Sequence, residues 1–281
     1  MKKRAITKRF ILIFMAAIFL LTLMPALNAF AKKEMSTWDA VKKRGSFRYG
    51  AVSNLPYFYR DPKTGKAHGL SVKYAEDIAK VMGVKAVPVD TTWGNMVAAL
   101  QSGQIDMAPF LIPVPARAMA VEFINNPIAY MVESILIHKD LNVTDWNDLK
   151  KLKIAVGMGS ANDIFITKKF PEVKIIRYPS ADESFAAFQS GRAEVFVTMS
   201  MSGIAYLSKA GNVKLVIPKP VFYSGLHNAV RREPDKTWRD FLNTCAGYYY
   251  TSGKVQEWLD ETMVEFSIDP KNVPSVMKER W

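Results

Sequence analysis

A nine-residue pattern occurs twice in the chain, at Ala98–Asp106 (AALQSGQID) and again at Ala186–Glu194 (AAFQSGRAE). Each copy is typical of a helix end, followed by a glycine where the chain turns left-handed and an acid that opens an apolar strand. The strands are predicted at Met107–Leu111 and Val195–Met199. Two copies of this unit, far apart in the sequence, predict two α/β lobes of similar architecture. A cleft between two lobes suits closure around a small molecule.

Strands and helices alternate along the rest of the chain. Within 71–82 the apolar residues follow a helical stripe that ends at Gly83, which favours a helix with a glycine cap. Alternating elements favour mostly parallel sheets, whose ligands bind beyond the carboxyl ends of the strands. The other predicted strands are 47–52, 84–89, 153–156 and 173–178, and the other predicted helices are 38–44, 95–102 and a helix from about residue 161.

The N-terminal 31 residues have the pattern of a secretory signal peptide. Basic residues between Lys2 and Arg9 precede an apolar run at Phe10–Leu23, and Ala29-Phe30-Ala31 provides a small-x-small cleavage site. A membrane anchor is the alternative, but the apolar run is short for a membrane span. No cysteine directly follows the run, so a lipid anchor has no attachment point. We therefore expect cleavage after Ala31 and export, most simply to a bacterial periplasm.

Composition excludes several classes of function. The net charge of +12 falls to +7 once the five bases of the leader are removed, and the remaining bases are scattered. No basic stripe alternates with aromatic residues, so nucleic-acid binding is not expected, although weak steering of anionic ligands is compatible with the charge. Cys245 is the single cysteine, which excludes an internal disulfide and fits a buried position in a helix. The three histidines share no ligand spacing, so we expect no metal and no cofactor.

The sequence contains no convincing enzyme motif. Gly157 and Gly159 begin a glycine pattern, but Asn162 stands where a dinucleotide-binding fingerprint needs its third glycine. Ser160 lacks the following glycine of a nucleophile elbow, and no phosphate-binding loop is present.

The chain resembles the family 3 extracellular solute-binding proteins, which are the amino-acid-binding components of bacterial importers. The resemblance covers essentially all of the chain after the predicted leader, in an order and spacing that are more specific than any one motif. The segments that carry it are Gly50–Phe58 (GAVSNLPYF) with Asp61, Gly65 and Gly69-Leu70, then Trp93–Asp106 (WGNMVAALQSGQID), Pro115–Ala118 with Val121–Phe123 and Pro127, Asp148–Ser160 (DLKKLKIAVGMGS), and Gly247–Trp258.

This resemblance implies a type II periplasmic-binding-protein fold with two mostly parallel sheets and flanking helices. Lobe one would hold 36–130 and 228–281, and lobe two would hold 134–223. Two hinge strands, near 131–137 and 222–230, would join the lobes and let them close on the ligand. The implied protein performs no chemistry: as a monomer, it passes a small carboxylate-bearing solute to the membrane permease of an ABC importer.

The resemblance also carries a site onto particular residues. Arg117 matches an arginine that grips the ligand carboxylate, since a guanidinium holds a carboxylate through two parallel bonds. The alternative for Arg117 is a surface arginine in an ion pair. Trp93 matches an aromatic residue that covers the ligand side chain, and its alternative is an aromatic residue of the core. Ser160, at a helix N-terminus that favours anions, is expected both to bind ligand and to cap the helix. The complete expected ligand-binding set is Asn54, Tyr57, Phe58, Trp93, Phe110, Arg117, Ser160, Ala161, Asn162, Thr198 and Met199.

One departure from the family pattern concerns the ligand ammonium. Family members that bind α-amino acids usually place an aspartate at the end of the second repeated strand, where this chain has Thr198-Met199-Ser200. A buried ammonium without a partner is costly. Three alternatives remain open: another acid such as Asp163 substitutes, aromatic rings hold the cation, or the ligand carries no amine. The last is slightly favoured, with an aromatic or apolar body on the carboxylate.

Two alternative functions belong to other classes. Some relatives are cyclohexadienyl dehydratases, whose chemistry needs a general acid in the cleft. Thr198 and Met199 cannot readily serve, whereas a pocket acid at Glu133, Asp163 or Glu194 would favour an enzyme. The other alternative is a module that presents its ligand to a sensor or chemoreceptor.

Overall fold

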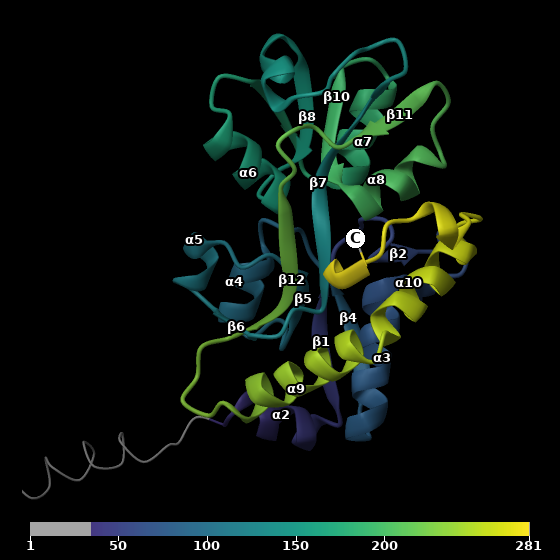
Figure 1. Cartoon of the computed structure of the whole chain (residues 1–281). Coiled ribbons are helices and arrows are strands. Elements are labelled where there is room, and N and C mark those ends of the chain that lie inside the picture. Colours follow the sequence, from purple (N-terminus) through teal and green to yellow (C-terminus); the bar gives the residue numbers. More distant parts are fainter. Residues whose placement is uncertain (1–34, 281) are drawn as a thin grey trace, which may run out of the picture.

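The computed structural model describes residues 35–280, which form a lower and an upper α/β part joined by two long strands (Figure 1). The predicted signal peptide lies outside these residues. The lower part holds α2 (Thr37–Arg44), β1 (Ser46–Ala51), β2 (Tyr59–Arg60), β3 (Ala67–His68), α3 (Leu70–Met82), β4 (Lys85–Asp90), α4 (Met96–Gln101), β5 (Ala108–Leu111), α5 (Pro115–Ala118) and β6 (Glu122–Phe123). The upper part holds η1 (Trp146–Lys151), β8 (Lys153–Gly157), α6 (Ala161–Lys169), β9 (Lys174–Tyr178), α7 (Ala181–Gln189), β10 (Val195–Met199), α8 (Ser200–Leu207) and β11 (Val213–Val216).

Two strands pass between the parts, β7 (Ala129–His138) and β12 (Tyr223–Val230). After β12 the chain returns to the lower part as α9 (Thr237–Thr251), α10 (Lys254–Glu265), η2 (Pro270–Asn272) and η3 (Lys278–Arg280). In the view of Figure 1, β7 and β12 form the vertical axis of the molecule, α9 crosses the lower part beneath them, and α10 lies to their right. No helix within 35–280 is both long and apolar enough to span a bilayer.

The sheets are mixed, and this corrects the prediction of mostly parallel sheets. Parallel pairs do occur between β1 and β4, between β8 and β9, and between β8 and β10. However, β7 ascends and β12 returns, so they pair antiparallel with each other, and each pairs antiparallel with its other neighbours. One hydrogen-bonded path, β5-β12-β7-β10-β8-β9, therefore runs through both parts.

The repeated sequence pattern performs the same structural task in each part. Gly103 and Gly191 follow α4 and α7 with φ of 69° and 74°, the left-handed conformation that the pattern predicts. Asp106 then accepts a hydrogen bond from the backbone N–H of Arg48 in β1 at 2.7 Å. Glu194 accepts the equivalent bond from the N–H of Lys153 in β8 at 2.9 Å. Each acid thus ties the start of its strand to the neighbouring parallel strand.

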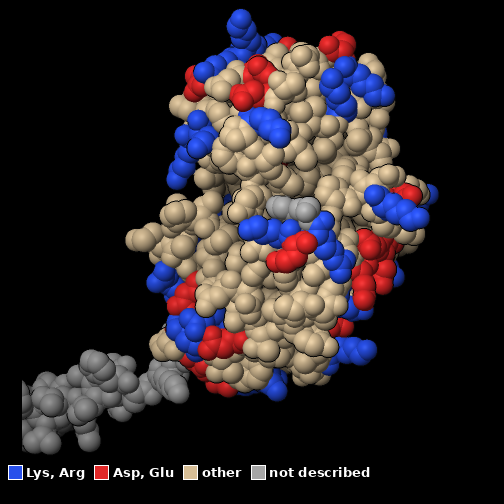
Figure 2. Space-filling model, viewed as in Figure 1, with Lys and Arg blue, Asp and Glu red and all other residues tan. Residues whose placement is uncertain are grey.

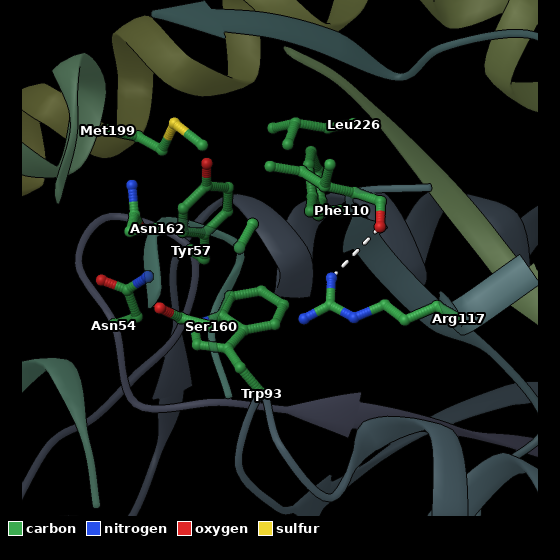
Figure 3. A pocket seen from close by; sticks show the side chains of 11 residues that line it. Asn54, Tyr57, Trp93, Phe110, Arg117, Ser160, Asn162, Met199 and Leu226 are labelled. Carbon is green, nitrogen blue, oxygen red and sulfur yellow. Dashed lines mark hydrogen bonds between the residues drawn. The ribbon is translucent and has the colours of Figure 1, made fainter. Parts of the chain in front are cut away.

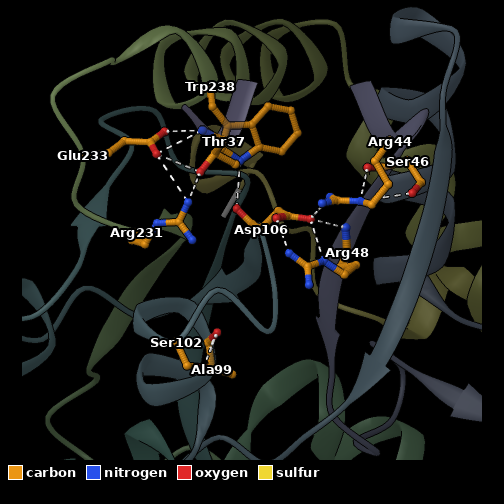
Figure 4. A network of polar contacts seen from close by, with 10 residues as sticks. All are labelled: Thr37, Arg44, Ser46, Arg48, Ala99, Ser102, Asp106, Arg231, Glu233 and Trp238. Carbon is orange, nitrogen blue, oxygen red and sulfur yellow. Dashed lines mark hydrogen bonds and ion pairs between the residues drawn. The ribbon is translucent and has the colours of Figure 1, made fainter. Parts of the chain in front are cut away.

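Asp106 carries additional contacts, drawn in Figure 4. Its side chain is 3% exposed and pairs with the guanidinium groups of Arg44 and Arg48, the latter at 2.8 Å. Its backbone carbonyl accepts a hydrogen bond from the indole N–H of Trp238 in α9 at 2.8 Å. This single residue therefore links α2, β1 and α9, which lie far apart in the sequence.

Aromatic side chains fill the cores of both parts. Trp238 lies 5.4 Å from Phe47 in the lower part, and Trp146 stacks on Phe170 at 5.7 Å in the upper part, both measured between ring centroids. Cys245 is a buried free thiol on α9, as the sequence predicted, and burial raises its pKa to about 11. On the face seen in Figure 2, basic and acidic side chains are interspersed without a continuous basic stripe.

Candidate functional site

A small pocket lies where the lower part, the upper part and β12 meet (Figure 3). The loops of the lower part contribute its aromatic residues and its arginine, and the upper part contributes the N-terminus of α6 and the end of β10. The residues that line it are Asn54, Tyr57, Trp93, Phe110, Ile112, Arg117, Ser160, Ala161, Asn162, Met199 and Leu226. Most of the residues expected to bind ligand are therefore brought together, although binding itself stays a prediction.

Three aromatic rings form one wall of this pocket. Tyr57 meets Trp93 edge-on at 6.1 Å and Phe110 at 5.4 Å between ring centroids. The hydroxyl of Tyr57 donates to the sulfur of Met131, which fixes the ring on β7. Phe110 has a φ of 56°, a conformation that bulky residues rarely adopt and that carries local strain. The wall is thus rigid, and it presents apolar surface to a ligand.

Arg117 is a buried cation at the other side of the pocket. The residue is 7% exposed, and its two terminal nitrogens donate to the carbonyls of Ile112 at 3.1 Å and Gly159 at 2.9 Å. No carboxylate within residues 35–280 forms an ion pair with it. Burial therefore lowers the pKa of Arg117 to about 10. A buried guanidinium held only by neutral dipoles is well suited to receive an anion.

The N-terminus of α6 faces the same pocket. Ser160 is the N-cap residue, and its side-chain oxygen accepts a hydrogen bond from the N–H of Asp163 at 3.1 Å. The first-turn N–H groups of Ala161 and Asn162 have no acceptor within the helix, and the helix dipole adds partial positive charge. Ser160 thus combines the two roles expected of it: capping the helix and lining the pocket.

The two parts touch directly beside the pocket. A Cβ placed on Gly159, whose φ is 70°, would lie 2.6 Å from the Cα of Gly94 across the cleft. Ser53 of the lower part also donates to Asp182 of α7 at 2.5 Å. The pocket itself is small, with a volume of about 30 Å³. The structure therefore represents a closed arrangement of the two parts.

Two expected site residues do not line this pocket. Phe58 is 3% exposed and packs in the core of the lower part. Thr198 precedes Met199 on β10, and because successive strand side chains point to opposite faces, only Met199 reaches the pocket. Ile112 and Leu226 line the pocket but were not predicted, since isolated aliphatic residues in a sequence carry no signal that separates a pocket wall from core.

The three acids considered for the cleft have different surroundings. Asp163 accepts hydrogen bonds from the Gly159 N–H at 3.0 Å and from Arg177 at 2.9 Å, so its carboxylate serves the fold. Glu194 accepts the hydrogen bond from the backbone N–H of Lys153 that ties β10 to β8. Glu133, on β7, is 3% exposed and accepts a hydrogen bond from the side-chain amide of Asn162 at 2.6 Å. Burial raises the pKa of Glu133 to about 8.

Glu133 lines a second and larger cavity, which adjoins the pocket. This cavity has a volume of about 330 Å³ and shares Ile112 and Ala161 with the pocket beside Arg117. Its other lining residues come from the loop before α5, from α6 and from the start of β12; they are Val114, Pro115, Ile164, Phe165, Lys168, Lys169, Phe222, Tyr223 and Ser224.

The sequence and the fold are similar to those of known proteins. The glutamate/aspartate import solute-binding protein of Escherichia coli (strain K12) is 23% identical over 254 residues, which cover 85% of this chain and 82% of that protein. The crystal structure of a cysteine-binding protein from Campylobacter jejuni is 22% identical with a TM-score of 0.76, over 86% of this chain and 100% of that one.

A second similar structure is the ancestral amino acid-binding protein AncCDT-1, a precursor of cyclohexadienyl dehydratase. It is 28% identical with a TM-score of 0.71, over 82% of this chain and 99% of that one. The chain thus has the fold of type II amino-acid-binding proteins, and the two relatives and the ancestral protein described above are named as solute-binding or amino-acid-binding proteins. The model of the family matches residues 48–263, and this chain therefore belongs to the bacterial extracellular solute-binding proteins, family 3.

Proposed function

We propose that the protein is a periplasmic binding protein that captures an amino acid or related organic acid and delivers it to the membrane permease of an ABC importer. The lower and upper parts are its two lobes, 36–130 with 228–281 and 134–223. The hinge strands are the segments near 131–137 and 222–230. The ligand carboxylate binds Arg117, and the lobes close around it.

The buried charge of Arg117 is the observation that carries this proposal. Among residues 35–280 its guanidinium has only the carbonyls of Ile112 and Gly159 as partners, and Gly159 belongs to the opposite lobe. A carboxylate at this position would replace a neutral acceptor by an anionic one, which gives stronger, charge-assisted hydrogen bonds. The N-terminus of α6 adds a second group that favours an anion.

Contacts across the cleft support a hinge mechanism. Closure brings Gly94 against Gly159 and Ser53 against Asp182, and a ligand that touches both lobes stabilises this closed state. The relatives named for glutamate and aspartate import and for cysteine binding support an amino acid as the ligand class. The importer is supported by the name of the first of these relatives.

Calorimetry and thermal unfolding of the protein from Lys32 onward test this proposal. A ligand at one hundred times its Kd stabilises the protein by about 2.7 kcal/mol and raises the melting temperature by several degrees. We expect standard L-amino acids or their deaminated carboxylates to give such a shift. Arg117→Gln should weaken the binding at least about 30-fold because it removes the charged partner. Arg192→Gln, an exposed arginine outside the pocket, is the matched control. Equal affinity in Arg117→Gln and wild type would refute the assignment.

A further inference from the structure

Glu133 lies at the point where the crossing strand β7 changes its partner. Val132 pairs with Tyr223 of β12, whereas Glu133 pairs with Met199 of β10. Residues directly opposite each other in an antiparallel pair place their side chains on the same face of the sheet. Met199 lines the pocket beside Arg117. The side chain of Glu133 therefore emerges on the face of the sheet that carries the site.

The carboxyl group of Glu133 is buried but poorly partnered. Glu133 is 3% exposed. Within the described part of the chain, its carboxyl group accepts one hydrogen bond, from the side-chain amide of Asn162. No lysine or arginine of residues 35–280 forms an ion pair with it. An ionised carboxylate in such a place is unfavourable unless a cation joins it. Asn162 also lines the pocket beside Arg117, so it connects the two charged groups.

The second cavity provides the space that the first lacks. Sites for small molecules typically measure about 300–1,000 Å³, so the cavity of 330 Å³ is within this range and the pocket of 30 Å³ is far below it. The pocket beside Arg117 is therefore small for a whole ligand. Ile112 and Ala161 line both cavities, so the second cavity adjoins this pocket, and its lining includes Glu133. It offers adjoining space for the rest of a ligand.

We infer that Glu133 binds the ammonium group of the ligand, and that the ligand is an amine-bearing carboxylate whose body fills the second cavity. The inference rests on the proposed function, in which Arg117 binds the carboxylate. Asp163, the acid that the sequence offered for this role, is occupied by Gly159 and Arg177. Glu133 thus supplies a negative charge next to the end of β10, where the sequence has no acid.

The lining of the second cavity restricts the ligand further. Its walls are largely apolar, with Val114, Ile164 and Phe165 among them, and its other charged residues are Lys168 and Lys169. Both lysines are exposed, and both line this cavity. Two positive charges disfavour a second cation in the ligand. The inferred ligand class is therefore an amino acid with an apolar or acidic side chain, and basic amino acids bind more weakly.

Binding of an ammonium to Glu133 is linked to proton release. Because burial raises the pKa of Glu133 to about 8, its carboxyl is mostly protonated at pH 7 without ligand. An ammonium favours the ionised form, so binding at pH 7 releases a proton, and affinity increases at least about tenfold from pH 6 to pH 8. β10 presents no titratable group here. The titratable and charged groups that face this region from the other elements are Tyr57, Arg117, Lys168, Lys169 and Tyr223.

The test compares each standard L-amino acid with its deaminated carboxylate by titration calorimetry. Wild type should bind an amino acid with an apolar or acidic side chain at least tenfold more tightly than its deaminated partner. Glu133→Gln, whose amide oxygen still accepts from Asn162, should bind both partners equally and lose the pH dependence. Glu172→Gln, at an exposed carboxylate beside Lys150, should behave as wild type. Titrations of wild type in two buffers of different ionisation enthalpy measure the proton release without any variant.

The outcomes separate this inference from the proposed function. If wild type binds a deaminated carboxylate as tightly as the amino acid, without proton release, and Arg117→Gln abolishes the binding, the role of Glu133 is refuted while the function stands. If basic amino acids bind best, the assigned ligand class is refuted. If neither member of any pair binds wild type, the proposed function fails and the inference fails with it.

Discussion

At the scale of single residues, Gly159 lies where the backbone of the upper part touches that of the lower part. Its φ of 70° already disfavours a side chain, and a Cβ would approach the Cα of Gly94 to 2.6 Å. Gly191 has a similar φ of 74°, yet a Cβ placed on it would have no neighbouring atom within 4 Å. A side chain would therefore strain the backbone at both glycines, but only at Gly159 would it also collide with the opposite part.

We expect Gly159→Ala and Gly191→Ala each to lower the free energy of unfolding by about 1 kcal/mol, the cost of a left-handed alanine. Gly159→Ala should also weaken ligand binding at least about tenfold, because the methyl group obstructs closure, which corresponds to roughly 1.4 kcal/mol. Urea unfolding and calorimetry measure the two effects separately. An equal loss of affinity in both variants would show that the contact with Gly94 does not limit closure.

Individual site residues were predictable to different degrees. Arg117, Trp93 and Ser160 were assigned from the resemblance and the order of motifs, and the structure brings them to one pocket. Phe58 and Thr198 were misplaced because a linear motif does not say which face of a strand or loop turns inward. Glu133 was named only as one of three acids for an enzyme. Its place beside Met199 depends on the register between two strands that are distant in the sequence.

At the scale of elements, the acids of the two repeat copies differ in the number of elements that they hold together. Asp106 is buried and links α2, β1 and α9, whereas Glu194 is exposed and bonds one backbone N–H. We expect Asp106→Asn to cost about 2 kcal/mol of unfolding free energy, reduced from the value for a fully buried pair because both arginines are about one-third exposed.

Glu194→Gln is the matched change in the other copy, and it should cost about 0.5 kcal/mol or less, because the amide oxygen of glutamine still accepts from the N–H of Lys153. Urea unfolding of the two variants provides the comparison. Equal losses would mean that the ion pairs of Asp106 with Arg44 and Arg48 add nothing to the bond that the repeat shares.

Long periodic elements were predictable from the sequence, and short or non-local ones were not. The predicted helix at 71–82 and the predicted strand at 195–199 agree with α3 and β10, because each has a clear apolar pattern and a glycine or acid at its boundary. The two-residue strands β2 and β3 are too short to show a period. The mixed character of the sheets arises from the antiparallel pairing of β7 and β12 with each other and with their other neighbours, and that pairing has no local signal.

At the scale of the whole molecule, the proposed closure depends on side-chain contacts between the lower and upper parts. Ser53 donates to Asp182, which also accepts from Tyr206 at 2.7 Å, and both Ser53 and Asp182 are exposed. Ser53→Ala removes a contact made only on closure and should weaken ligand binding about two- to fivefold, with the free energy of unfolding nearly unchanged.

Calorimetry and small-angle scattering of the ligand-bound Ser53→Ala variant measure this effect. Ser208→Ala, at the end of α8 and bonded within its own helix, is the control and should leave affinity unchanged. An affinity equal to wild type in Ser53→Ala would show that this contact contributes nothing to closure.

The position of Glu133 on a crossing strand has a mechanical consequence for the proposed closure. A group close to a rotation axis moves little when a lobe swings, whereas groups farther from that axis move further. The pairs that Glu133 makes with Met199 and with the backbone of Phe222 keep it near that axis. The ammonium receptor would accordingly be almost preformed before the lobes move. The ligand would first bind Glu133 near the hinge, and closure of the two parts would then bring the remaining contacts to it.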